Sequence, residues 1–217
     1  MIGVGYLVGR VGVGDGRHPA GLLSDAAAYA DGFGLIVIVP IVSLTFAAAS
    51  LGDLRDDGTL VYLWLRPMGR LPLVLAAVAA SVTVSLPLCV TPTVLGGWLA
   101  SGRVAGSGSL ALGALGAAAL GTVAYSCLFV LVGLLFRKAV MWGIGYVLLW
   151  EGLAVGLGDF AGRLSLRGYS RSLLAQIADI NLRFAANQLS TAITVLAAAS
   201  AAAIALAALR LHRIEVD

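Results

Sequence analysis

Long uncharged stretches alternate with short polar segments along the chain, and this pattern predicts its fold. A helix needs about 20 consecutive apolar residues to cross the hydrocarbon core of a bilayer. Five segments meet or approach this length, at 32–52, 71–102, 110–136, 139–158 and 189–209. We therefore predict an all-α, polytopic membrane bundle with five transmembrane helices.

Prolines interrupt two of the predicted spans. Pro40 is expected to kink the first span, because proline lacks a backbone N–H and its ring clashes with the preceding turn. For the same reason, three prolines are expected to bend or break the second span, namely Pro72, Pro87 and Pro92.

The segment 159–187 is more polar than the predicted spans, and its apolar residues recur at helical spacing. This spacing is typical of an amphipathic helix, which we expect to lie on the outer surface. Asp179 and Arg183 are four residues apart, the spacing of an ion pair along one helix face. The apolar positions are Leu173, Ile177, Ile180 and Phe184.

Composition narrows the class of protein. The 217 residues are 60% hydrophobic and 12% charged, which is typical of a membrane protein and excludes an ordinary soluble domain. The formal charge of +3 is small and scattered, so no nucleic-acid partner is expected. Cys89 and Cys127 lie within apolar stretches and lack the spacing of metal ligands. We expect a multi-pass protein of the cell (plasma) membrane.

The polar stretch 51–70, with the sequence LGDLRDDGTLVYLWLRPMGR, separates the first two predicted spans. Asp56 or Asp57 can cap a short helix by accepting hydrogen bonds from its first N–H groups. Pro67 ends that helix, because it disfavours helical geometry at the residue before it. We therefore predict a short apolar helix over 57–65 that lies at the membrane surface or in a groove on a partner.

This stretch resembles the region between the second and third helices of type 2 ABC-transporter permeases. The shared order is an acidic turn, Gly-Thr-Leu, a short apolar helix and Arg-Pro, flanked by two apolar helices. The resemblance implies that 57–65 is a cytosolic coupling helix that docks on a separate ATP-binding cassette subunit. The residues it implicates in coupling are Asp57, Gly58, Thr59, Leu60, Leu63, Trp64, Arg66 and Pro67. One departure is that the family often has a glutamate before the turn, where this chain has Asp53 and Leu54.

The same resemblance implies six spans and a pathway shared with a second permease copy or homologue. Residues 1–13 would then be the remnant of a truncated first span, because Arg10 cuts that apolar run short. Residues 15–31 would form the first external loop, helical in part over 19–29. Basic residues beside the helix ends place 53–70 and the C-terminus in the cytosol.

A transporter of this class needs a source of energy. The chain has a single lysine, Lys138, which is followed by Ala139, so it contains no Gly-Lys-Ser/Thr loop to hold phosphates. We therefore predict a transporter subunit that is not an enzyme and binds no cofactor of its own. ATP and Mg²⁺ are expected on the partner subunit.

Two other functions stay open on the sequence alone. A lipid head-group enzyme of the phosphatidyltransferase type would use Asp53, Asp56 and Asp57 to hold metal. The further aspartates that two metals require are absent from residues 60–150. A non-catalytic membrane assembly factor is the other alternative.

Glu151 is the only charged residue inside a predicted span. Because exposing a charge to lipid is costly, such a residue indicates a functional site, here the pathway or its outer gate. The structural alternatives are a neutral side chain, one paired with an external arginine such as Arg163, or one that simply lies near the outer mouth.

Overall fold

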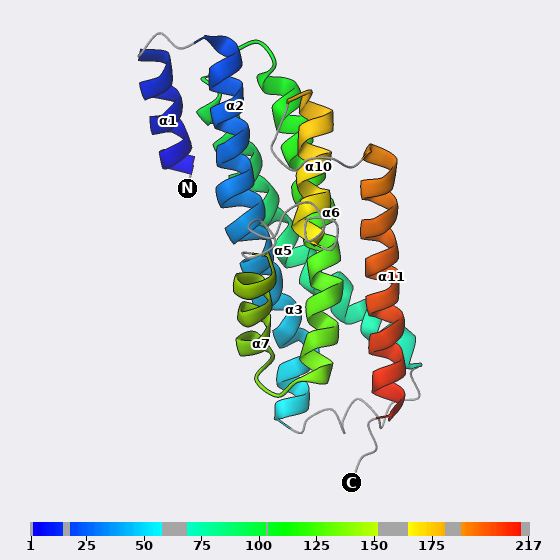
Figure 1. Cartoon of the computed structure of the whole chain (residues 1–217). Coiled ribbons are helices and arrows are strands. Elements are labelled where there is room, and N and C mark those ends of the chain that lie inside the picture. Colours follow the sequence, from blue (N-terminus) through cyan, green and yellow to red (C-terminus); the bar gives the residue numbers. More distant parts are fainter. Residues whose placement is uncertain are drawn as a thin grey trace.

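The computed structural model describes residues 2–14, 18–57, 69–102, 104–151, 165–180 and 188–213. Every element within these ranges is a helix (Figure 1). In chain order they are α1 (Ile2–Gly14), α2 (Pro19–Tyr29), η1 (Ala30–Ile38), α3 (Val39–Asp56), α5 (Arg70–Ala100), α6 (Ser107–Leu135), α7 (Ala139–Gly145), η2 (Tyr146–Glu151), α10 (Leu166–Ala178) and α11 (Leu189–Arg213), where η marks a π-helix.

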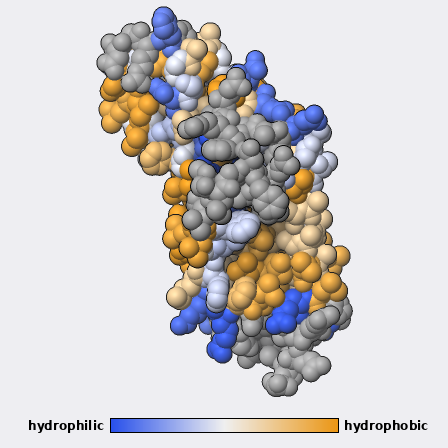
Figure 2. Space-filling model, in the orientation of Figure 1, coloured by the Kyte–Doolittle hydropathy of each residue, from blue (hydrophilic) through white to orange (hydrophobic). Residues whose placement is uncertain are grey.

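The predicted all-α membrane bundle is confirmed. Four helices are long and apolar enough to cross a bilayer, at Ala20–Gly52, Arg70–Ala100, Ser107–Leu135 and Leu189–Leu211. Among the coloured residues of Figure 2, hydrophobic ones lie beside and below the centre of the face shown, and most strongly hydrophilic ones lie towards its two ends. This distribution is what a bilayer requires, since an unpaired charge exposed to lipid is costly. The expected fifth span, 139–158, is described only for its first thirteen residues, as α7 and η2.

Helix α6 is the centre of the bundle, and it packs against α3, α5, α10 and α11. Glycines allow two of these neighbours to approach its backbone closely. A Cβ atom at Gly133 would lie 3.0 Å from the carbonyl oxygen of Ala48 on α3, and one at Gly113 would lie 2.9 Å from that of Leu174 on α10. Small residues at such crossings bring membrane helices into close van der Waals contact.

The first span is longer than we expected. We placed its start at residue 32, after Asp31, and assigned 15–31 to an external loop. Instead α2, η1 and α3 follow one another without a break, so that Asp31 lies inside a helix and only 4% of it is exposed. The charge misled the prediction because its burial depends on distant partners, which are described below.

The π-helical segment η1 lies directly before Pro40. The N–H of Val39 donates to the carbonyl of Gly34, five residues earlier, instead of the usual four. Pro40 has no N–H to continue the α-helical pattern and its ring crowds the carbonyl four residues before it, which favours a wider turn at this point. The prolines of α5, which were expected to bend or break that helix, do not break it. It is continuous from Arg70 to Ala100 with Pro87 and Pro92 inside it.

Two half-length helical pieces approach each other at the middle of the bundle. In Figure 1, α7 and η2 rise from the end where α3 and α6 finish, and this described part reaches about halfway along the bundle. Helix α10 starts at a similar height and continues to the opposite end. Residues 152–164, which link the two pieces in sequence, lie outside the described residues.

The expectation that 159–187 forms a surface helix is wrong for the described part, α10. Most of this helix is buried, including Arg167 and Leu173, and it packs on α6. It ends at Ala178, where Asp179 adopts a left-handed conformation with φ of 53°. The proposed Asp179–Arg183 pair required a continuous helix, and Arg183 itself lies outside the described residues.

Candidate functional site

A buried ion cluster joins η1 to α10. Arg167 and Arg171 are four residues apart on α10 and therefore share one helix face. Both guanidinium groups contact the same carboxylate oxygen of Asp31, at 3.2 Å from Arg167 and 3.4 Å from Arg171. Only 7% of the Arg167 side chain and 15% of the Arg171 side chain are exposed. The cluster therefore lies inside the bundle, although the partners are more than 130 residues apart in the chain.

Glu151 lies at the end of η2 and is equally buried, with 3% of the residue exposed. Its carboxylate accepts a hydrogen bond from the Ser165 hydroxyl at 2.5 Å and another from the Tyr146 hydroxyl at 3.3 Å. Ser165 is also the N-cap of α10, where its oxygen accepts from the N–H of Gly168 at 3.2 Å. One serine thus connects the carboxylate to the positive end of the α10 dipole, which favours negative charge nearby.

Tyr125 on α6 connects the two carboxylate sites. Its side chain is 1% exposed and lies within electrostatic range of Glu151, Tyr146 and Arg167. Its hydroxyl makes no hydrogen bond of normal geometry to the described residues, but it lies close enough to Glu151 to interact with that carboxylate. Aromatic packing fixes its ring, because Tyr125 stacks on Phe129 and Phe129 meets Tyr146 edge to face. The two carboxylate sites are also joined through α10, which carries Ser165 at its N-cap and Arg167 two residues later. We call Asp31, Arg167, Arg171, Glu151, Ser165, Tyr146 and Tyr125 the buried polar cluster.

The formal charges of the buried polar cluster balance, with two arginines and two acidic residues. Balance matters at this depth because an unpaired charge among apolar helices is strongly unfavourable. The hydrogen bonding is nevertheless incomplete within the described residues. The second carboxylate oxygen of Asp31 and the Nε atoms of Arg167 and Arg171 are buried without a hydrogen-bond partner there. The cluster therefore has both donor and acceptor capacity to exchange partners or hold a polar group.

The residues predicted from the sequence fall into two sets. Glu151 belongs to the buried polar cluster, held by Ser165 and Tyr146, whereas Arg163, which we considered as its partner, lies outside the described residues. Asp57 is exposed, just beyond the end of α3. Asp57 is the only predicted coupling residue that is described. The others lie outside the described residues, namely Gly58, Thr59, Leu60, Leu63, Trp64, Arg66 and Pro67.

Sequence reasoning missed most of the buried polar cluster. We described Glu151 as the only charge buried in a span, but Asp31 and Arg167 are buried as well. The i,i+4 spacing of Arg167 and Arg171 was a signal that could have been used, since two arginines on one face of a mostly apolar helix need a common anion. Among the described residues, no three His, Cys, Asp or Glu side chains gather as metal ligands.

Comparison of this chain with family models, with curated proteins and with solved structures gave no match. The likeness of residues 51–70 to type 2 ABC permeases therefore rests on those residues alone.

Proposed function

We propose that this chain is the membrane-spanning permease subunit of an ATP-binding-cassette exporter. The observation that carries the proposal is the buried polar cluster, which lies where two half-length helices approach each other inside an apolar bundle. Ionisable residues in membrane helices commonly mark transport pathways. Interrupted helices near the bilayer midplane are a recurrent way to build transporter binding sites.

The two carboxylate sites join α10 to two different helices of such a pathway. Asp31 and its two arginines tie the long first span to α10. Glu151 and Ser165 tie the end of η2 to the start of α10. A movement of α10 would change both sets of contacts together, which is the behaviour expected of a gate. We assign Glu151 to this gate.

The helix ends that flank residues 58–68 also support the proposal. The end of α3 and the start of α5 lie at the same end of the bundle as the turn between α6 and α7 (Figure 1). A coupling helix at that end would meet an ATP-binding cassette subunit carrying ATP and Mg²⁺ at the inner face of the cell membrane. A second permease copy or homologue would complete the pathway. This chain itself has no catalytic role in the proposal.

Co-purification tests the proposal. The chain would be co-purified with any ATP-binding cassette subunit that a neighbouring gene encodes, and both the bound partner and the ATPase rate would be measured. We expect the double variant Leu63→Ala/Trp64→Ala to lose the partner, because truncating one buried anchor of an interface costs about 2 kcal/mol or more. Arg55→Ala, just before this segment, is the matched control, because we expect a solvated charge there, and such a charge is worth under about 1 kcal/mol.

Two results would contradict the proposal. If the wild-type chain retains no ATP-binding subunit, the permease assignment fails. If the Leu63→Ala/Trp64→Ala variant stays fully assembled and its ATPase rate still responds to transport substrates, then 57–65 is not the coupling helix. A lipid head-group transfer activity in the purified chain without its partner would favour the enzyme alternative instead.

A further inference from the structure

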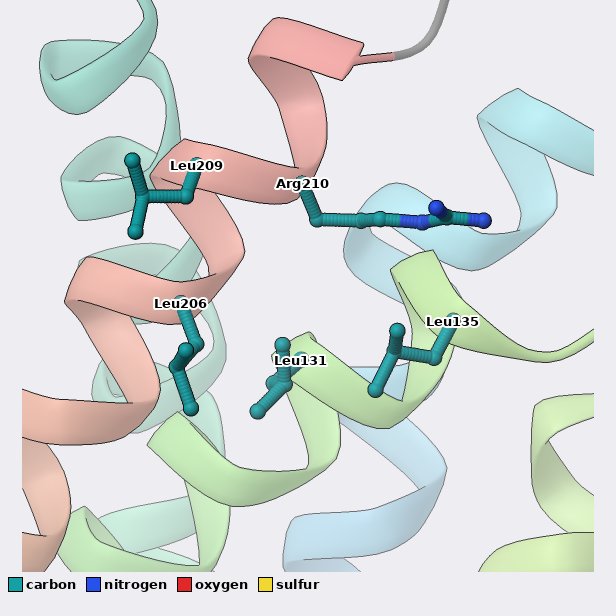
Figure 3. A pocket seen from close by; sticks show the side chains of 5 residues that line it. All are labelled: Leu131, Leu135, Leu206, Leu209 and Arg210. Carbon is teal, nitrogen blue, oxygen red and sulfur yellow. The ribbon is translucent and has the colours of Figure 1, made fainter.

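A groove lies between α6 and α11, close to the end of the bundle where both helices finish (Figure 3). Its volume is about 330 Å³, at the lower end of the range of roughly 300–1,000 Å³ found for small-molecule sites. Leu131 and Leu135 line it from α6. Leu206, Leu209 and Arg210 line it from α11.

The wall of this groove is aliphatic apart from one cation. Leu206 and Leu209 are more than half exposed, at 53% and 59%. They lie on the outward side of α11, whereas Ala203, Ala207 and Leu211 form the stripe that packs inward. In a membrane-spanning helix an outward apolar face contacts lipid, so the natural occupant of the groove is a hydrocarbon chain.

Arg210 gives the groove a polar end. It is exposed and belongs to the last turn of α11, at the same end of the bundle as Arg137 and Lys138. In Figure 3 its side chain extends past Leu135 and the end of α6, so the guanidinium lies beyond the leucines. A long basic side chain at a helix end reaches the membrane surface in this way.

We propose that this groove binds one anionic phospholipid, with an acyl chain along the four leucines and the phosphate of the head group on Arg210. Charge complementarity selects this occupant. A neutral solute would find no second polar group in the wall, whereas basic pockets between transmembrane helices are known to hold anionic head groups. The site is separate from the buried polar cluster, and the proposal does not depend on the transport function.

The test is native mass spectrometry of the full chain, titrated with phosphatidylglycerol or with phosphatidylcholine of the same acyl composition. We expect one phosphatidylglycerol to bind about fivefold more tightly than phosphatidylcholine, because one arginine near an anionic head group contributes about 1 kcal/mol. Arg210→Gln should abolish this preference and leave phosphatidylcholine binding unchanged. Leu206→Trp should fill the groove and remove the bound lipid of either kind.

Matched controls separate the groove from general membrane contact. Arg137→Gln removes an exposed arginine from the same end of the bundle, and Leu148→Trp enlarges an exposed leucine on η2. Both should retain the wild-type preference. A photoactivatable phosphatidylglycerol should label peptides from the ends of α6 and α11, and free glycerol phosphate should not compete with it.

Three outcomes would overturn the proposal. The head-group assignment fails if Arg210→Gln keeps the fivefold preference. The groove assignment fails if Leu206→Trp retains the lipid. If Leu206→Trp instead converts a dimer into a monomer without changing lipid retention, the groove is covered by a second copy of this chain.

Discussion

Asp31 and Glu151 are both buried carboxylates, but the bundle holds them in different ways. Asp31 has two guanidinium partners on α10. Glu151 is held by the hydroxyls of Ser165 and Tyr146, with no ion pair within the described part of the chain. Contacts to arginine require a negative carboxylate, whereas hydroxyls can both donate and accept. The first arrangement is suited to fixing two helices together, and the second to changing its contacts during a transport cycle.

The largest effect is expected at Asp31. Asp31→Asn leaves two buried arginines without their counter-charge, and breaking a buried pair typically costs about 3–5 kcal/mol. We expect a matching loss in the free energy of unfolding, measured by denaturation in detergent micelles. Asp179→Asn is the control, since this exposed carboxylate ends the same helix that carries the arginines. Equal stability of Asp31→Asn and the wild type would show that the arginines do not depend on Asp31.

A smaller loss is expected at Ser165, which serves both the carboxylate and the helix. Ser165→Ala removes the N-cap of α10 and one hydrogen bond to Glu151. Loss of an N-cap typically costs about 1 kcal/mol, and up to about 2 kcal/mol in some proteins. Ser165→Thr keeps the hydroxyl and should restore most of that stability in the same denaturation measurement. A threonine variant as unstable as the alanine variant would mean that the hydroxyl is not what holds this site.

Glu151→Gln should change the stability of the protein little but stop transport. A glutamine keeps the shape and still offers an oxygen to Ser165, so the free energy of unfolding should fall by less than about 1 kcal/mol. If the ionised carboxylate belongs to a gate, however, transport by the reconstituted complex should stop. The measurement is substrate flux into or out of proteoliposomes, with bound ATP-binding subunit as the assembly control. Unchanged flux and assembly would remove Glu151 from the proposed gate.

The smallest effect is expected at Tyr125, whose hydroxyl is buried without a hydrogen-bond partner among the described residues. Removing such a group is close to neutral or slightly stabilising, because its desolvation is not compensated. Tyr125→Phe should therefore leave the unfolding midpoint almost unchanged. Tyr146→Phe, which loses a hydrogen bond to Glu151, should cost about 1 kcal/mol. The opposite ranking would show that Tyr125 is the tyrosine that holds Glu151.

The sequence predicted the helical class and the approximate place of the long spans, because uncharged apolar runs of about 20 residues are typical of membrane-spanning helices. It failed where charges were taken as span boundaries. Asp31 was placed outside the membrane because a lone aspartate belongs in water. Its partners Arg167 and Arg171 come from a segment 136 residues and more away, so no local pattern could pair them.

Helix α10 was misjudged for a related reason. Of the four apolar positions placed on one face of a surface helix, Leu173 and Ile177 lie within α10, Ile180 follows its end and Phe184 lies outside the described residues. Gln176 and Asp179 were expected to meet water and are exposed, but the helix carries further polar residues, Arg167, Ser170 and Ser172, and all three are buried. Amphipathic spacing alone cannot separate a surface helix from one whose polar side meets other polar groups. The predicted coupling residues from Gly58 to Pro67 stay predictions.

The π-helical segment η1 determines which way the side chains before it face relative to those after it in the first span. Each residue of an α-helix turns the chain by about 100°. Because the segment from Ala30 to Ile38 is wound more widely than an α-helix, it shifts that rotation between the two parts of the span. Asp31 faces Arg167 while Leu44 and Leu51 face the core. Inserting or deleting a residue between Asp31 and Pro40 would therefore rotate Asp31 away from Arg167, just as replacing the aspartate would remove the ion pair.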